Sequence, residues 1–444
     1  MTPAFRYDFF VAVLTLAISF GESVEAASEV PKSGRGVIVA EAPAPGTYAS
    51  LPPGVHAVTG TCSGAIAITP FIPYLAGKGS AYPAVYDCES KTFEVLSAPA
   101  NHMSLADLTQ TEDGFYFYSN SFENNVFEGQ YALYDLSGKL RRVLFRPNDA
   151  KVHDMILRGR EITYIRYVPD WDASSCGKGA PLEVEVVTED QDGNQLWTWT
   201  SKGRLNREHN VGTDGSMHAP QVGRLRRFFR SVRNCYSSLA RNLFTFDTPS
   251  WFLSDDRVPM LAIDLDDYVH VNSIQWLEPS GNLLVVSRHL ELIFQVDPKS
   301  GEIVWSLGGR FATATRERPV GDPRGGFSHP HYARIVGNKL WVFDNANLFN
   351  GLPSRAVAYQ LDSKPPNRLV FEFAEPNGRQ RYSLGSVEAI DDDHLLIGWG
   401  AVNPQDMAEP QRAASIVRIS DGKETFAMDM KPSWISYRAK MWRP

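Results

Sequence analysis

The hydrophobic positions of this chain recur as short runs that are grouped in fours. In the clearest group, apolar runs at 271–277, 283–287, 291–297 and 302–307 are separated by turns rich in Pro, Gly, Asn and Ser. Short runs of β-branched and aliphatic residues bounded by such turns are typical of antiparallel hairpins. We therefore predict a unit of four short strands.

The same pattern returns along most of the chain. A first copy is expected between Gly54 and Val95, with 85–87 as its third strand. Further copies are marked by the apolar runs 115–118, 131–134, 162–164, 340–343 and 395–399. Four strands repeated every 40 to 60 residues or so are typical of propeller blades, which stack around an axis to bury their faces. We count six copies and predict an all-β, six-bladed propeller of four-stranded antiparallel blades, with seven or eight blades as the alternative.

Two segments fall outside this repeat. Residues 201–265 are predicted to be an insertion, in which Val222–Arg233 has the pattern of a short basic amphipathic helix. Such a helix either packs on the edge of the disc or contacts a membrane or another anionic partner. The uncharged run Phe9–Phe20 follows Arg6 and precedes small residues, as in a secretory signal peptide.

The signal sequence sets the expected domains and location. We assign residues 1–26 to the signal peptide and 27–444 to a single propeller domain, with the protein periplasmic or secreted. Retention of the uncleaved segment as a membrane anchor is the alternative, although the run is short for a bilayer span. No other membrane contact is expected.

Cysteine content and net charge narrow the picture further. An exported chain with four cysteines is expected to form disulfides, and sequence proximity favours Cys62–Cys88 and Cys176–Cys235 among three pairings. The absence of Cys-x-x-Cys spacing argues against a structural zinc site. The net charge of −7 argues against binding to nucleic acid, which needs a cationic face.

Histidines mark the candidate site. Propellers place ligands at the axis, where the first strand of each blade begins. Three predicted first strands open with histidine, and an arginine follows a second strand, so the candidate residues are His153, His270, Asn272, Arg288, His329 and His331. Imidazoles, a guanidinium and a carboxamide, with no paired carboxylate nearby in the sequence, suit an anionic substrate.

Two other roles are open to these residues, as core groups or as metal ligands. Single histidines in strands are more often satisfied core groups than catalysts. Imidazole is also a common metal ligand, but a cation beside Arg288 would be costly. His289 is expected to point outward or between blades, because side chains alternate along a strand.

The two central units resemble the bacterial arylsulfate sulfotransferases. The likeness rests on His270-Val-Asn272-Ser-Ile, on Gly281-Asn-Leu-Leu-Val-Val-Ser-Arg288, and on Val296-Asp297 with Ser300-Gly-Glu-Ile-Val-Trp305-Ser-Leu-Gly-Gly309. It continues in His331-Tyr-Ala-Arg334 and Leu340-Trp-Val-Phe-Asp-Asn345. The match is strong over 264–347 and diffuse over the rest of the chain.

The resemblance implies a six-bladed periplasmic propeller that moves a sulfuryl group from a phenolic sulfate ester to a phenol. It implies ping-pong chemistry through a sulfohistidine, without a nucleotide donor, so no cofactor and no metal are expected. The family nucleophile falls on His331, with His329 as the fallback and further substrate contact. The other family positions fall on His153, His270, Asn272 and Arg288.

Two other functions stay open at this point, as does a homodimer. The run 296–305 is similar to the blade-docking motif of quinoprotein dehydrogenases, although it occurs cleanly only once. A propeller that binds ligands or partners without catalysis is the second alternative. Scattered, outward-facing histidines would favour it.

Overall fold

The residues that the computed structural model describes all lie in one compact unit of the chain, Ala40–Pro444. The described residues are 44–72, 81–96, 102–111, 114–123, 126–135, 139–144, 153–170, 180–209, 265–313, 315–349, 351–362, 364, 366–402 and 406–442. The predicted signal peptide, the basic helix at 222–233 and most of the predicted insertion lie outside these residues. Within them, no helix has the length and apolar character needed to cross a membrane.

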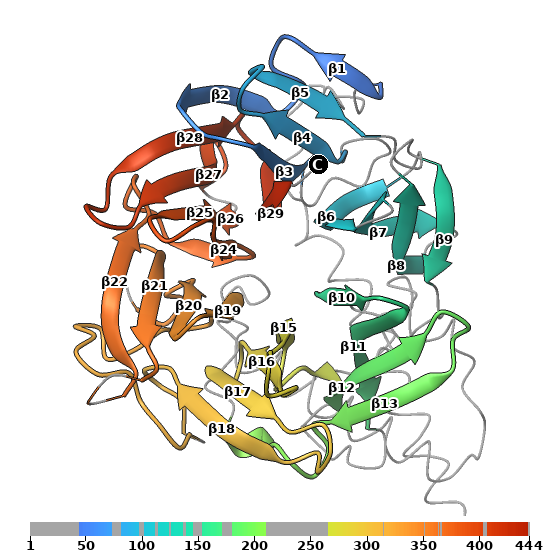
Figure 1. The fold of residues 1–444 in the computed structure, drawn as a ribbon, viewed down its shortest axis with the longest axis vertical. Helices are drawn as coiled ribbons and strands as arrows, with labels where there is room; N and C mark the ends of the chain where they lie inside the picture. The colour runs from blue at the N-terminus through green and yellow to red at the C-terminus, as the bar shows by residue number, and fades with distance from the viewer. Residues whose placement is uncertain are drawn as a thin grey trace, which may run out of the picture. The chain divides into compact units, whose positions relative to one another are not determined.

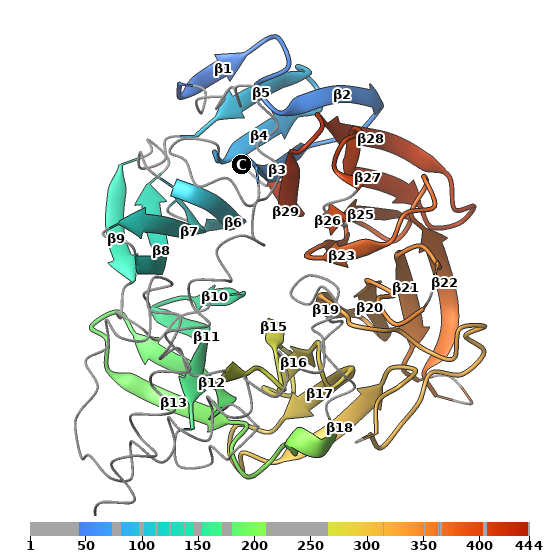
Figure 2. The same ribbon diagram turned by 180° about the vertical axis from the view of Figure 1, so that it is seen from behind.

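In the described residues the strands form seven sheets, of which six are blades arranged around an axis (Figure 1), and the view from behind shows the same ring (Figure 2). The second blade contains β6 (His102–Thr111), β7 (Gly114–Glu123), β8 (Val126–Asp135) and β9 (Leu140–Leu144). The third contains β10 (Met155–Arg158), β11 (Glu161–Pro169), β12 (Ala180–Asp190) and β13 (Gln195–Thr200), and β14 (Leu265–Asp266) pairs with β12 in parallel. A short 3-10 helix at Arg207–His209 follows β13.

The fourth and fifth blades are antiparallel meanders of the same kind. The fourth contains β15 (Val271–Trp276), β16 (Leu283–Ser287), β17 (Leu292–Val296) and β18 (Ile303–Gly308). The fifth contains β19 (Tyr332–Val336), β20 (Lys339–Asp344), β21 (Arg355–Gln360) and β22 (Arg368–Ala374). The predicted strands of the clearest unit therefore agree with β15 to β18 to within a residue or two.

Strands from both ends of the described chain close the ring. The first blade has β29 (Ile435–Trp442) innermost, followed by β3 (Ala65–Phe71), β4 (Ala84–Asp87), β5 (Thr92–Val95) and β1 (Gly46–Tyr48). The last blade contains β24 (Ser386–Ala389), β25 (His394–Gly398), β27 (Gln411–Arg418) and β28 (Glu424–Met430), with β2 (Val55–Gly60) at its outer edge. A two-stranded sheet of β23 (Arg381–Ser383) and β26 (Ala401–Val402) lies beside them in sequence.

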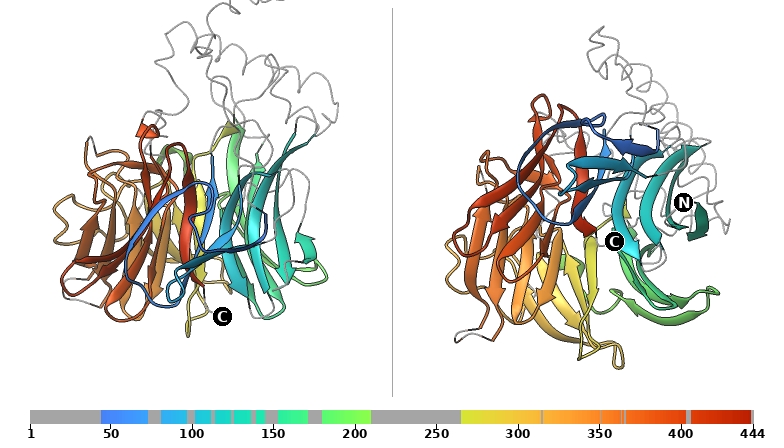
Figure 3. Two further views of the ribbon diagram at one scale, coloured as in Figure 1. Left: turned by 90° about the horizontal axis from the view of Figure 1, so that it is seen from above. Right: turned by 45° about the horizontal axis from the view of Figure 1, so that its top comes forward.

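The prediction of a six-bladed, all-β propeller is confirmed. The first copy expected between Gly54 and Val95 is wrong in one respect, because β2 pairs with β28 of the last blade and not with β3. Residues 85–87 do form the third strand from the axis, as β4. Seen from the side, the strands run between two faces of the ring (Figure 3).

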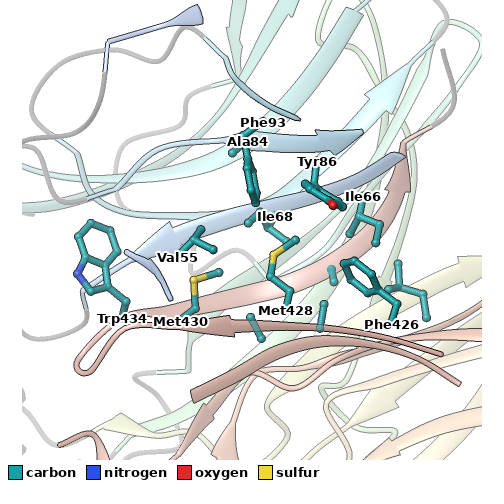
Figure 4. Close-up of a cluster of buried hydrophobic side chains, with 14 of the residues drawn as sticks. Val55, Ile66, Ile68, Ala84, Tyr86, Phe93, Phe426, Met428, Met430 and Trp434 are labelled. Carbon is teal, nitrogen blue, oxygen red and sulfur yellow. The ribbon is translucent and has the colours of Figure 1, made fainter. Parts of the chain in front are cut away.

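A buried apolar cluster holds the first and last blades together (Figure 4). The Tyr86 ring lies 4.8 Å from that of Phe93 in the first blade and 5.7 Å from that of Phe426 in the last. Met428 and Met430 of β28 belong to the same cluster and are fully buried. Because apolar burial is the main favourable term in folding, this contact stabilises the closed ring.

A disulfide adds a covalent link at the same place. Cys62 follows β2 and Cys88 follows β4, and the structure joins them as the sequence analysis predicted. The bond therefore ties the outer edge of the last blade to the first blade. The second predicted pair, Cys176–Cys235, lies outside the described residues.

We expect the double variant Cys62→Ala, Cys88→Ala to unfold more easily. The bond closes a loop with a sequence separation of 26, which in the chain-entropy account stabilises the folded state by about 3 kcal/mol. Alanine is the suitable replacement because Cys88 packs in the apolar cluster. Urea unfolding of both proteins measures the difference, and a change smaller than about 0.5 kcal/mol would contradict the prediction.

Candidate active site

Three histidines from consecutive blades meet at the axis. His153 lies just before β10, His270 just before β15 and His331 just before β19. The ring centroids of His153 and His270 are 4.8 Å apart, and the His331 centroid lies 6.5 and 6.4 Å from them. The first strands thus bring together three of the predicted residues, because each histidine stands where its innermost strand begins.

The tautomer of His331 follows from its hydrogen bonds. Its Nδ1 lies 3.1 Å from Oδ1 of Asn345, whose Nδ2 donates to the main-chain carbonyls of Arg381 and Leu384. Since Nδ2 is the donor of the amide, Oδ1 must accept, and Nδ1 of His331 carries the proton. The lone pair of the imidazole is therefore on Nε2. Sequence analysis did not assign Asn345 to the site.

The surroundings of His331 keep it uncharged. The side chain is 2% exposed, and burial is the main cause that lowers its pKa well below the usual 6.5. The positive charge of Arg288 lowers the pKa further, followed by the charges of His270 and His153. His331 is thus a neutral imidazole with an available Nε2 at neutral pH.

His270 is held by a carboxylate three residues earlier. Oδ2 of Asp267 lies 2.6 Å from Nδ1 of His270, and Oδ1 accepts a bond from the His270 main-chain N–H at 3.2 Å. His270 has a positive φ of 47°, and His329 shares this conformation with a φ of 53°. The sequence indicated no paired carboxylate near the histidines, whereas the structure places one carboxylate, that of Asp267, against His270. The Asp-x-x-His spacing at 267–270 was the signal that could have found it.

Arg288 lies beside this pair and is 5% exposed. Its main-chain N–H donates to the His270 carbonyl at 3.0 Å, and its Nη2 donates to the Tyr382 carbonyl at 3.2 Å. Its Nη1 lies 2.8 Å from Nε2 of His289. The guanidinium is therefore fixed by bonds from both sides.

Of the two positions expected for His289, outward or between blades, the outward one is wrong, because the ring is buried near His270 and His329. Strand β16 ends at Ser287, and the chain turns over the next residues, with the Glu291 N–H donating to the Arg288 carbonyl. Side-chain alternation applies only within a strand, so it fails at this turn. The His289 ring is buried, with its centroid 4.4 Å from that of His270.

Asn272 and His329 are both fully buried, but they have different neighbours. Nδ2 of Asn272 donates to the Pro330 carbonyl at 3.0 Å, and among the described residues its Oδ1 has no hydrogen-bond partner. Nδ1 of His329 lies 3.4 Å from a Glu291 carboxylate oxygen. The centroid of the His329 ring lies 6.0 Å from that of His289, so His329 neighbours His289 in the site.

A layer of buried ion pairs, here called the ionic layer, lies next to the three histidines and consists of Asp107, Asp154, Arg334 and Arg438. Arg438 of β29 donates to Asp107 at 2.6 Å, to Asp154 at 3.0 Å and to the Asn272 carbonyl at 2.8 Å. Arg334 donates to the other oxygen of Asp154 at 3.2 Å. Burial by itself would raise the pKa of Asp154, but Arg438 and Arg334 hold that pKa below its ordinary value.

A cavity of about 1400 Å³ lies beyond this layer. Asp154, Tyr332, Arg334 and Lys440 line it, whereas the three histidines do not. Asp154 and Tyr332 contribute to the cavity wall, whereas the residues directly before them in the chain, His153 and His331, do not. The ionic layer therefore separates the histidines from the cavity.

Part of the site contains a set of potential metal ligands. The ligand atoms of Asp267, His270 and His289 lie within 4.8 Å of one another. Both nitrogens of His289 already have partners, however, with Nδ1 facing a carbonyl and Nε2 facing the Arg288 guanidinium. A metal ion would have to displace that guanidinium and sit beside its charge. The arrangement suits an anion better than a cation.

Solved structures align with most of this chain, but with low sequence identity and low TM-scores. A protein of unknown function from Bacteroides caccae has 11% identity and a TM-score of 0.46, covering 84% of this chain and 99% of its own. A putative 6-phosphogluconolactonase from Bacteroides uniformis has 14% identity and a TM-score of 0.41, covering 83% and 82%. These likenesses carry no argument about activity.

Sequence comparisons give a clearer result. No curated protein matches the chain. The model of the arylsulfotransferase (ASST) family matches residues 74–438, which include the whole of the second to fifth blades and all the candidate residues. The chain belongs to the arylsulfotransferase family.

Proposed function

We propose that this protein transfers a sulfuryl group from a phenolic sulfate ester to a phenol, through a covalent intermediate on His331. The observation that supports this most directly is the state of His331. It is a buried, neutral imidazole near the buried guanidinium of Arg288. Its lone pair is on Nε2, because Nδ1 donates its hydrogen to Asn345. A nucleophile needs that lone pair, and a sulfate ester needs the positive charge beside it.

Arg288, His270 and Asn272 are suited to hold the non-bridging oxygens of the ester. A guanidinium binds such oxyanions through short, charge-assisted hydrogen bonds. Asn272 adds the Nδ2 hydrogen that does not go to Pro330, and His270, whose Nδ1 bonds to Asp267, adds its Nε2–H when the ring is doubly protonated. Donors that are fixed before the reaction stabilise developing charge without reorganisation. Sulfuryl transfer, like phosphoryl transfer, depends mainly on such positioning and charge stabilisation.

In the first half-reaction, Nε2 of His331 forms a bond to sulfur while the bond from sulfur to the aryl oxygen breaks. The electron pair leaves with the oxygen, and a proton from His270 or His153 converts the phenolate into a phenol. The bond from Nδ1 of His331 to Asn345 stabilises the positive charge on the sulfated imidazole. In the second half-reaction, an acceptor phenol returns a proton to His270 or His153, whichever gave up its proton in the first half. The phenol oxygen bonds to sulfur, and the bond from sulfur to Nε2 of His331 breaks.

We place this activity outside the cytoplasm, in the periplasm or the secreted fraction. The Cys62–Cys88 disulfide supports this location, since such bonds persist in oxidising compartments. The segment 9–20 supports export as well. The partners in this proposal are small phenolic molecules, with no cofactor required.

The variant His331→Ala tests the proposal directly. We expect transfer from 4-methylumbelliferyl sulfate to phenol to fall about 1000-fold or more, because no other group supplies the attacking nitrogen. Without acceptor, the unchanged protein should gain the mass of one sulfuryl group in intact-mass analysis, and the variant should not.

A matched control is His394→Ala, since His394 is the half-exposed first residue of β25 and its side chain bonds to Asp391, three residues earlier. That variant should keep full activity. Undiminished transfer by His331→Ala would contradict the assignment.

The pH dependence of the first half-reaction gives a second test. The pKa of free histidine is 6.5, and that of His331 is well below it, so His331 stays neutral as the pH falls through 6.5. With 4-nitrophenyl sulfate, whose leaving group needs little protonation, the rate of adduct formation should stay flat through this range and fall only in more acidic solution. A midpoint near 6.5 would contradict it. The lowered pKa of His331 also affects the stability of the fold. As the pH falls below 6.5, His331 takes up a proton in the unfolded chain but not in the folded one, so the free energy of unfolding decreases.

A further inference from the structure

Asp267 offers two acceptors to the site, and each holds a different histidine. Its carboxylate accepts from Nδ1 of His270 at 2.6 Å, and its main-chain carbonyl faces Nδ1 of His289 at 2.5 Å. Asp267 and His270 are about one-fifth exposed in their side chains, whereas His289 is buried. One residue therefore anchors two imidazoles that stand side by side.

The bonds of His289 determine where its proton lies. A carbonyl oxygen can only accept, so Nδ1 of His289 carries the hydrogen that points at Asp267. Nε2 then has the lone pair and accepts from Nη1 of Arg288 at 2.8 Å. Burial, followed by the charge of His270, lowers the pKa of His289 well below 6.5, which is consistent with a neutral ring.

We propose that Asp267 and His289 are positioning residues, which separately hold the proton donor and the sulfuryl-binding arginine of the reaction described above. This inference rests on the proposed function. The Asp267 carboxylate orients His270 and stabilises its protonated form, so it serves protonation of the leaving phenolate. His289 orients Arg288, so it serves binding of the sulfuryl oxygens.

A neutral acceptor suits Arg288 better than a carboxylate would. Arg438, Arg355 and Arg381 are buried elsewhere in the ring, and each bonds to carboxylates that offset its charge. Arg288 gives two of its bonds to uncharged acceptors, the His289 ring and the Tyr382 carbonyl. These two bonds orient the guanidinium and do not themselves offset its charge.

Three variants separate the two roles. Asp267→Asn removes the carboxylate but keeps the main-chain carbonyl, so His289 and Arg288 should stay in place. His289→Leu removes both hydrogen bonds of the ring. His289→Gln replaces the ring with an amide that can donate to the carbonyl and accept from Arg288, and it serves as the conservative control.

The measurement is kcat and KM for a series of aryl sulfates, from nitrophenyl to unsubstituted phenyl. For Asp267→Asn we expect a loss of less than about 3-fold with the nitrophenyl ester and about 100-fold with the phenyl ester, because only the poorer leaving group needs a proton. For His289→Leu we expect kcat/KM to fall about 10- to 100-fold with every ester and KM to rise. His289→Gln should stay within about 3-fold of the unchanged protein.

Two outcomes overturn the inference while leaving the proposed function intact. One is full kcat/KM in His289→Leu, and the other is a loss in Asp267→Asn that is equal for all leaving groups. Equal losses in His289→Leu and His289→Gln would also overturn it, since they indicate a general packing defect.

Two measurements that need no turnover test the inference if a variant does not fold or if the protein shows no transfer. Nitrogen-15 spectra of the unchanged protein should show His289 protonated on Nδ1, and protonation on Nε2 instead would overturn the inference even if a variant failed to fold. Calorimetry with phenylsulfonate, an inert anion, should show a larger loss of binding in His289→Leu than in Asp267→Asn, because only the first variant releases Arg288. If the unchanged protein binds phenylsulfonate and transfers nothing, the proposed function fails while the positioning of Arg288 is still tested.

Discussion

Arg438 places a positive charge at the axis of the ring, on the strand that closes it, with 3% of the residue exposed. A guanidinium so far from water must be compensated, and Arg438 is compensated by Asp107 of the second blade and Asp154 of the third. It also donates to the Asn272 carbonyl of the fourth blade. The closing strand is thereby bonded to three other blades at one point. Loss of either carboxylate would leave this buried charge with only one of its two ion-pair partners.

The candidate site stands on this layer. Asp154 belongs to the layer and the Tyr332 ring lies against the Arg438 guanidinium, and the residues just before them, His153 and His331, belong to the site. Because His153 and His331 are joined in the chain to residues that the layer holds, the layer also helps to fix the positions of these two histidines. The Arg438 charge reaches the site as well, as one of the causes that lower the pKa of His331. Structural closure and the state of the candidate nucleophile are therefore linked through one side chain.

The chemistry that suits this site is the handling of a tetrahedral anion by groups of different charge. Arg288 supplies a fixed positive charge, whereas His331 and His289 are kept neutral by burial. A neutral imidazole can attack or accept a hydrogen bond, and a guanidinium cannot, so the two roles require different residues. Membership of the arylsulfotransferase family agrees with this division. The sulfohistidine pathway and the substrates are our proposals for this chain.

The sequence by itself determined the fold class, the six blades and the place of His153, His270 and His331 at the start of innermost strands. These features follow from local periodicity, which each short strand and turn carries in its own residues. Only the tertiary structure decided the closure by β2 and β29 and the bonding of Asn345, Arg438 and Asp267. Those contacts join residues that are far apart in the chain, or that lie in turns where strand alternation no longer fixes direction, as at His289. Periodicity specifies which side of a strand a residue occupies, but the partner it meets depends on how the blades close.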